Sequence, residues 1–164
     1  MRDLAGLIAA ILPAPVHRAG YRLAHALRVR WWRLTRPQLT GCRVIALDDD
    51  ARVLLIRHSY SDDRWMLPGG GMKRGEDPVA AGARELAEEA GCALHDARVA
   101  TVLETTAFGI PNRVYVVVGQ ARGEVRADGR EITHAEFFAI DALPDHRVDG
   151  LGERLAEWLE RDDI

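Results

Sequence analysis

One stretch decides the fold of this chain: Gly70-Gly71-Met72-Lys73-Arg74-Gly75-Glu76, followed after seven residues by Arg84-Glu85-Leu86-Ala87-Glu88-Glu89-Ala90-Gly91-Cys92. Residues three and four apart lie side by side on an α-helix, so the second run places Glu85, Glu88 and Glu89 together. A bound cation would offset the repulsion between these carboxylates, and backbone N–H groups of a glycine loop can face phosphate oxygens. The stretch therefore predicts a site for a divalent cation and a phosphate chain.

The helix that carries the carboxylates has recognisable ends and two faces. Asp77-Pro78 predicts an N-cap followed by proline at the first helical position, and Gly91 predicts the end of the helix. The apolar face holds Val79, Ala83, Leu86 and Ala90. Ala81 and Gly82 fall on the acidic side, where their small size predicts room for a ligand against the carboxylates.

The donor atoms indicate which cation would bind. Carboxylate oxygens suit hard ions, and Mg²⁺ is usually held by a few carboxylates together with water and substrate phosphate oxygens. We therefore expect Mg²⁺, with Mn²⁺ as the alternative. The competing interpretation is that Glu85, Glu88 and Glu89 form the solvated face of an ordinary amphipathic helix.

The spacing of the two runs resembles the Nudix box of the Nudix hydrolase family. The matching positions are Gly70, Glu76, Arg84, Glu85, Leu86, Glu88, Glu89, Gly91 and Cys92. Cys92 stands where an aliphatic residue is usual, which is a mild departure because a buried cysteine behaves as a small hydrophobe. The resemblance includes residues 65–70 and 136–144, and it covers the chain from about Leu39 to the C-terminus.

This resemblance implies a fold and a reaction for residues 39–164. The fold would be α/β, a sandwich of helices on both sides of a mixed β-sheet. The reaction would be hydrolysis of the pyrophosphate bond in a nucleoside diphosphate linked to another moiety, by attack of water on phosphorus. Glu85, Glu88 and Glu89 would bind the metal ion, with Gly70 of the loop beside them.

The resemblance also implies roles around the metal. Arg84 would orient a neighbouring glutamate through a charge-assisted hydrogen bond, and Glu76 would brace the loop against the helix. A general base must reach the attacking water directly or through one other water, and Glu89 and Glu131 are the candidates. Glu104, within an apolar strand pattern, ranks behind them.

The substrate is less defined than the reaction, because contacts to the base and the leaving group come from loops outside the box. Nucleoside triphosphates, including deoxynucleotides, are the default expectation, and ADP-ribose or another nucleotide sugar is the alternative. A nucleotide-binding regulatory module without catalysis is a second class of function. The candidate substrate-binding residues, whose aromatic members are also candidates for the core, are Arg57, Trp65, Gly71, Phe108, Asn112 and Tyr115.

Apolar alternation orders the rest of the domain. Strands are expected over 41–47, 52–58, 65–67, 97–106, 113–121 and 132–140, and a second helix over 151–161. No P-loop, Rossmann glycine fingerprint or serine nucleophile motif is present in the sequence, so those enzyme classes lack support.

Residues 1–38 form an extension that differs from the domain in charge. Eight arginines and one acid fall within residues 1–43, although the whole chain carries a net charge of −3. The apolar stretch 4–16 is too short to span a bilayer, and we expect it to be retained rather than cleaved. The pattern over 21–32 predicts a basic helix that would pack on its own domain, join a homodimer or contact an anionic membrane through residues 1–36.

Length and cysteine usage bound the remaining possibilities. A chain of 164 residues suits one catalytic domain with a substantial core. Cys42 and Cys92 lack metal-site spacing, which favours a reduced, cytoplasmic setting. We expect a nucleotide-type small molecule as the partner and no stable complex with nucleic acid.

Overall fold

The computed structural model describes residues 39–59, 63–127, 129 and 131–160. The predicted helical extension, residues 1–38, lies outside these described residues, and so do its predicted contacts with a membrane or a second copy of the chain. Within the described part, no helix is long and apolar enough to cross a membrane.

Five strands form one mixed sheet. They are β1 (Leu39–Leu47), β2 (Val53–His58), β3 (Ala93–Ala107), β4 (Ile110–Arg122) and β5 (Ile132–Phe138). Their order across the sheet is β3-β4-β1-β2-β5. β1 runs parallel to β4, whereas the other neighbouring pairs are antiparallel. The predicted mixed sheet is confirmed, although β3 and β4 are longer at both ends than the apolar pattern indicated.

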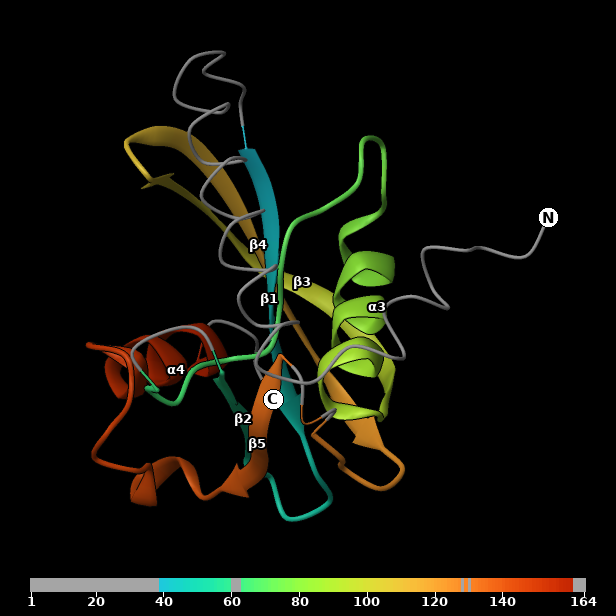
Figure 1. Cartoon of the computed structure of the whole chain (residues 1–164), viewed down its shortest axis with the longest axis vertical. Helices are drawn as coiled ribbons and strands as arrows, with labels where there is room; N and C mark the ends of the chain where they lie inside the picture. The colour runs from blue at the N-terminus through green and yellow to red at the C-terminus, as the bar shows by residue number, and fades with distance from the viewer. Residues whose placement is uncertain (1–38, 60–62, 128, 130, 161–164) are drawn as a thin grey trace, which may run out of the picture.

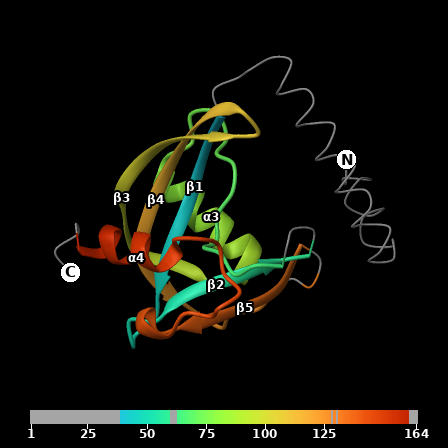
Figure 2. The same cartoon turned by 90° about the vertical axis from the view of Figure 1, so that its left-hand side faces the viewer.

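Helices cover both faces of the sheet (Figures 1 and 2). On one face, helix α3 (Pro78–Ala90) buries Leu86 and Ala90 against β1 and β2. On the other face, helix α4 (Leu151–Glu160) contributes Leu155 and Trp158 to a second apolar cluster. The predicted α/β/α sandwich is therefore confirmed. The last expected strand stops at Phe138, and the 3-10 turn η1 (Ile140–Ala142) follows it.

The sheet opens between β1 and β2, and the glycine loop fills the opening. The two strands pair in register only at Leu47 and Val53. Beyond that point, the N–H groups of Cys42 and Val44 donate to the carbonyls of Gly70 and Pro68, each over 2.9 Å. The strand expected at 65–67 is present only as isolated bridges, because the chain leaves β2 there and crosses to the edge of β1. The loop is thus anchored to the sheet.

Helix α3 begins and ends where its local signals predicted. The carboxylate of Asp77 accepts hydrogen bonds from the N–H groups of Val79 and Ala80, both at 3.0 Å, and Pro78 opens the helix. Gly91 ends it in the left-handed conformation, with φ of 71°, which costs glycine little because it lacks a Cβ.

The prediction that Ala81 and Gly82 leave room for a ligand is wrong. Both residues are buried, and a Cβ on Gly82 would lie 3.3 Å from the Cγ2 atom of Val44 on β1. Their small size instead lets the helix approach the sheet closely. Glu89 is buried on the same helix, so the acidic side of α3 is only partly exposed to solvent.

Candidate active site

Glu89 is a buried carboxylate that lies beside the glycine loop. Glu89 is only 8% exposed, and its Oε2 atom accepts a hydrogen bond from the Gly69 N–H at 2.8 Å. Burial is the main cause that raises the pKa of Glu89 to about 8, and the negative charges of Glu85 and Glu131 act in the same direction. His58 places its Nε2 atom 3.9 Å from the Oε1 atom of Glu89.

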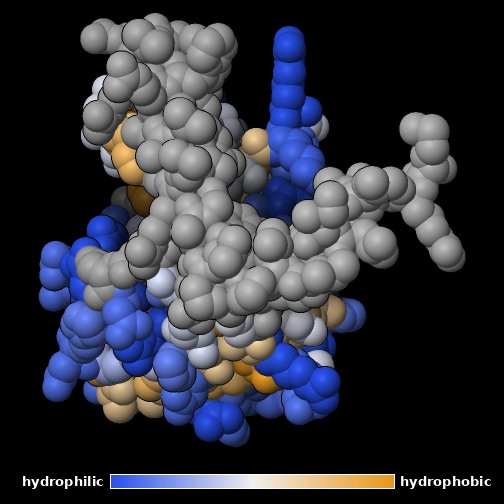
Figure 3. Space-filling model, in the orientation of Figure 1, coloured by the Kyte–Doolittle hydropathy of each residue, from blue (hydrophilic) through white to orange (hydrophobic). Residues whose placement is uncertain are grey.

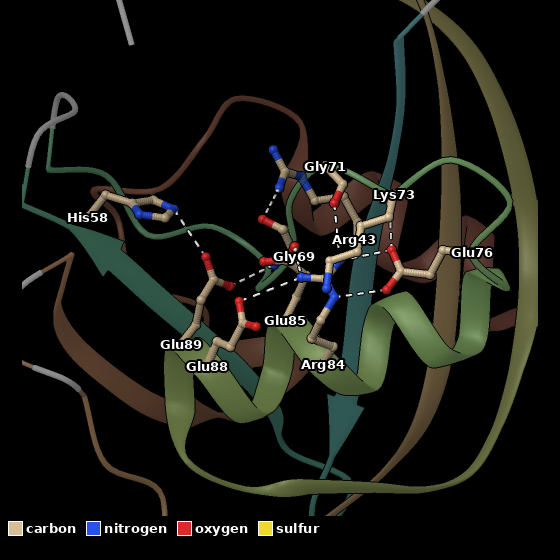
Figure 4. A network of polar contacts seen from close by, with 10 residues as sticks. All are labelled: Arg43, His58, Gly69, Gly71, Lys73, Glu76, Arg84, Glu85, Glu88 and Glu89. Carbon is tan, nitrogen blue, oxygen red and sulfur yellow. Dashed lines mark hydrogen bonds and ion pairs between the residues drawn. The ribbon is translucent and has the colours of Figure 1, made fainter. Parts of the chain in front are cut away.

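Arg84 lies at the centre of a network that joins the loop to the helix (Figure 4). Its Nε and Nη2 groups donate to both carboxylate oxygens of Glu76, at 2.8 and 3.0 Å. Its Nη1 group donates to Glu85 Oε1 at 2.6 Å and lies 3.5 Å from Glu88 Oε2. Nη2 also donates to the carbonyl of Gly71 at 3.2 Å. One guanidinium therefore contacts three box carboxylates and the loop backbone.

The electrostatics of this network follow from the pairing. The hydrogen bond from Arg84 is the main cause that lowers the pKa of Glu76 to about 2. Glu76 and Glu85 in turn raise the pKa of Arg84, so both partners stay charged at any physiological pH. Glu76 also accepts a hydrogen bond from the Lys73 N–H at 2.7 Å, which ties the turn before α3 to the same network. Figure 3 shows a hydrophilic projection at the place where Figure 1 draws the loop that leads into α3.

Gly70 makes space for Glu85. A Cβ atom on Gly70 would lie 2.7 Å from Glu85 Oε2 and 2.8 Å from Oε1, which is closer than real side chains approach. Gly69 is constrained by the sheet instead, because a Cβ there would lie 2.3 Å from the carbonyl oxygen of Cys42. The two glycines are therefore constrained for different reasons, Gly70 by the Glu85 side chain and Gly69 by the backbone of β1.

The residues present fit a hard divalent cation. Glu85, Glu88 and Glu89 supply only oxygen donors, which is the chemistry that Mg²⁺ and Mn²⁺ prefer. Glu85 and Glu88 each contact Arg84 through one oxygen, leaving a second oxygen for a ligand. Across the described residues, no three acidic, histidine or cysteine side chains converge closely enough to hold an ion as they stand.

The two further carboxylates considered as general bases lie in different places. Glu131, at the start of β5, is near enough for its charge to raise the pKa of Glu89, and its carbonyl accepts a hydrogen bond from the Ser59 N–H at 2.8 Å. Glu104, on β3, accepts a hydrogen bond from Arg113 Nε at 2.6 Å. Of these two carboxylates, Glu131 is the one whose charge acts on Glu89.

Arg57, on β2, and Trp65, which precedes the glycine loop in sequence, lie close together. Arg57 donates from Nε to the backbone and side chain of Asp63, both at 2.9 Å, and its guanidinium lies 5.5 Å from the ring centre of Trp65. Trp65 is 8% exposed and packs edge to face on Phe138, with ring centres 4.8 Å apart. The indole therefore belongs to the core on the α4 side.

The remaining candidate substrate residues are spread along the hairpin of β3 and β4. Phe108 is 46% exposed at the turn between these strands. Asn112 is paired with Leu39 in the sheet, at the end where Gly41 bridges to Gly71. The structure therefore brings Asn112 and the glycine loop to the same end of the sheet and leaves Phe108 at the tip.

Sequence reasoning overlooked Arg43 and His58. Arg43 Nη1 donates to the Gly69 carbonyl at 2.9 Å, and His58 is buried against Glu89. A signal for Arg43 was present, because it is the one charged residue in the buried strand run Cys42–Leu47. His58 ends the apolar run of β2 and carried no comparable signal.

Comparison with known proteins identifies the family. The model of the NUDIX domain matches residues 37–160. The chain therefore belongs to the Nudix hydrolase family. A MutT Nudix hydrolase from Burkholderia pseudomallei is similar in structure, with a TM-score of 0.63 and 28% identity, over 76% of this chain and 98% of that chain.

Two other similarities have a lower sequence identity or cover a shorter segment. An ADP-ribose pyrophosphatase from Streptococcus suis 89-1591 shares the fold, with a TM-score of 0.61 and 23% identity, over 78% of this chain and 94% of that one. Diphosphoinositol polyphosphate phosphohydrolase 3-alpha from Mus musculus is 43% identical over 51 residues, 31% of each protein. The match thus spans about a third of the length of that relative.

Proposed function

We propose that this protein hydrolyses a pyrophosphate bond in a nucleoside diphosphate linked to another moiety, in a reaction that requires Mg²⁺ or Mn²⁺. The observation that supports this best is the pair of contacts between loop and helix: Glu89 bonded to the Gly69 N–H and Glu85 lying against Gly70. These contacts bring to one place an anchored glycine loop, which can face phosphate oxygens, and a carboxylate cluster, which can bind a cation.

Each residue has a distinct task in this proposal. Glu85, Glu88 and Glu89 would hold the cation, with the backbone of Gly70 beside them. Arg84 would position Glu85 and Glu88, because its fork already contacts both. When bound, the cation would neutralise phosphate charge and help to polarise the attacking water.

The proton of the attacking water needs a carboxylate acceptor. Glu131 and Glu89 are both proposed for this role, since each lies in the acidic cluster and Glu131 is not needed to hold the helix against the loop. Glu104 is less suitable, because its carboxylate is bonded to Arg113.

Nucleoside triphosphates, including deoxynucleotides, are proposed as the substrate class, with ADP-ribose and other nucleotide sugars as the alternative. The MutT and ADP-ribose pyrophosphatase similarities support keeping both classes. Diphosphoinositol polyphosphates are a third class to test, because the 43% identity to their phosphohydrolase falls within a 51-residue segment. A cytoplasmic location and contacts of residues 1–36 with a membrane or a second copy stay predictions.

A substrate panel with product identification tests the proposed function. The full chain is incubated with these three classes, with Mg²⁺ and with a chelator, and products are identified by ³¹P NMR. Reaction in ¹⁸O-labelled water is expected to place the label on phosphorus and to split a phosphoanhydride bond only when Mg²⁺ is present. Mg²⁺-independent turnover, or no turnover of any panel member, would contradict the proposal.

A further inference from the structure

Arg43 presents an arginine side chain at the glycine loop from the face of the sheet opposite helix α3. In strand β1, Val44 and Ala46 pack toward α3, whereas Ile45 and Leu47 belong to the cluster on the α4 side. Side chains alternate along a strand, so Arg43 starts on the α4 side. Figure 4 shows its guanidinium and the carboxylate of Glu89 meeting the same residue, Gly69.

Gly69 is therefore held from two directions, by an arginine and by a glutamate. Arg43 Nη1 donates to its carbonyl at 2.9 Å, and Glu89 Oε2 accepts from its N–H at 2.8 Å. The positive charge of Arg43 acts at the carboxylate, since it lowers the pKa of Glu89 against the effect of burial. The guanidinium is thus close enough to the acidic cluster to influence it.

Two of the other arginines near the loop already have carboxylate partners. Arg84 contacts Glu76 and Glu85, and Arg57 contacts Asp63. Arg43 differs, because among the described residues its guanidinium makes one hydrogen bond, to a backbone carbonyl, and no ion pair. A guanidinium carries five N–H donors in a planar fork, so most of its donors remain for a ligand.

We propose that Arg43 is a substrate-binding residue that holds non-bridging oxygens of the diphosphate on the side of Gly69 away from the helix carboxylates. A diphosphate carries more negative charge than one divalent cation removes, and a planar guanidinium matches phosphate oxygens well. Arg43 would keep its bond to Gly69 with one N–H group and donate to the phosphate with others. This inference rests on the proposed function and adds one binding residue to it.

Asn112 lies on the same face of the sheet as Arg43. It pairs with Leu39, two strand positions from Gly41 and four from Arg43, so these residues share one face of the sheet. A ligand held by Arg43 that extended along this face toward Leu39 would reach Asn112.

Binding of methylenediphosphonate, a diphosphate that cannot be hydrolysed at its bridge, tests the proposal without turnover. Its Kd is measured by calorimetry with saturating Mg²⁺ for the full-length wild type, Arg43→Gln and Arg43→Lys. Arg122→Gln is the control, because Arg122 pairs with Asp49 at the exposed end of β4. We expect Arg43→Gln to raise the Kd about tenfold or more, Arg43→Lys to raise it less, and the control to leave it unchanged.

A second measurement separates phosphate binding from a purely structural role. Mn²⁺ affinity without diphosphonate is measured by electron paramagnetic resonance, and Arg43→Gln is expected to keep it unchanged or tighter, because a positive charge is removed. Weakened Mn²⁺ binding in this variant, an unchanged Kd for diphosphonate, or no binding by the wild type would overturn the proposal. Diphosphonate binding without hydrolysis of any substrate would instead refute the proposed function alone.

Discussion

The carboxylate of Glu85 lies against the backbone of Gly70, so closely that a Cβ on Gly70 would stand 2.7 Å from Oε2. Gly70→Ala must therefore displace Glu85, and we expect Mn²⁺ affinity to fall roughly 10-fold to 100-fold. Gly71→Ala is the matched control, because a Cβ there meets nothing within 4 Å. Equal Mn²⁺ affinities for the two variants would show that Glu85 does not depend on this contact.

Arg84→Lys tests whether the fork of Arg84, rather than its charge, organises the site. A lysine cannot donate to Glu76, Glu85 and the Gly71 carbonyl together. We expect kcat to fall roughly 10-fold to 100-fold, while circular dichroism shows the fold intact. Arg122→Lys, at an exposed ion pair, should leave kcat unchanged. Full activity of Arg84→Lys would mean that a positive charge alone suffices.

Glu89 should make the metal-free protein less stable as the pH rises. Its pKa is raised from 4.5 to about 8, so the folded state keeps a proton that the unfolded state has lost between these values. The stabilisation is complete below about pH 4.5 and is lost as the pH rises through about 8. Thermal unfolding with a chelator should show Tm falling over this range, and Glu89→Gln should flatten the fall. Parallel pH profiles for the two proteins would contradict a protonated Glu89.

The two proposed general bases make different predictions. Glu131→Gln should lower kcat and leave Mn²⁺ affinity nearly unchanged if Glu131 takes the proton of water. Glu89→Gln should lower both quantities, because Glu89 is also proposed to hold the cation. Single-turnover rates and Mn²⁺ titrations of both variants provide the comparison. Normal kcat in Glu131→Gln would leave Glu89 as the base.

The helix of the site could be predicted from sequence because its signals are local. Asp77, Pro78 and Gly91 determine where α3 begins and ends through contacts within a few residues. Pairing of β1 with β4 could not be derived in this way, because it joins segments about 70 residues apart and depends on the whole sheet. The family resemblance supplied the sandwich and the mixed sheet, but not the strand order.

The errors at the site have one physical origin. Helical periodicity alone placed Ala81 and Gly82 on a ligand-facing side, but packing against Val44 decides which side of α3 is buried. The same packing buries Glu89, which raises its pKa. Arg43 was overlooked because its role depends on the glycine loop crossing to the edge of β1, a long-range contact without a local pattern.

The proposed role of the α3 carboxylates in binding the catalytic cation is tested most directly by the turnover of Glu88→Gln and Glu89→Gln. Their Mg²⁺-dependent turnover is measured on the best substrate of the panel. Glu153→Gln, an exposed acid of α4, is the control. We expect both site variants to stay folded. Their turnover should fall by more than the roughly 10-fold to 100-fold that is typical when a residue supporting a metal ligand is removed. Turnover near that of the wild type in both variants would show that α3 is not the catalytic centre.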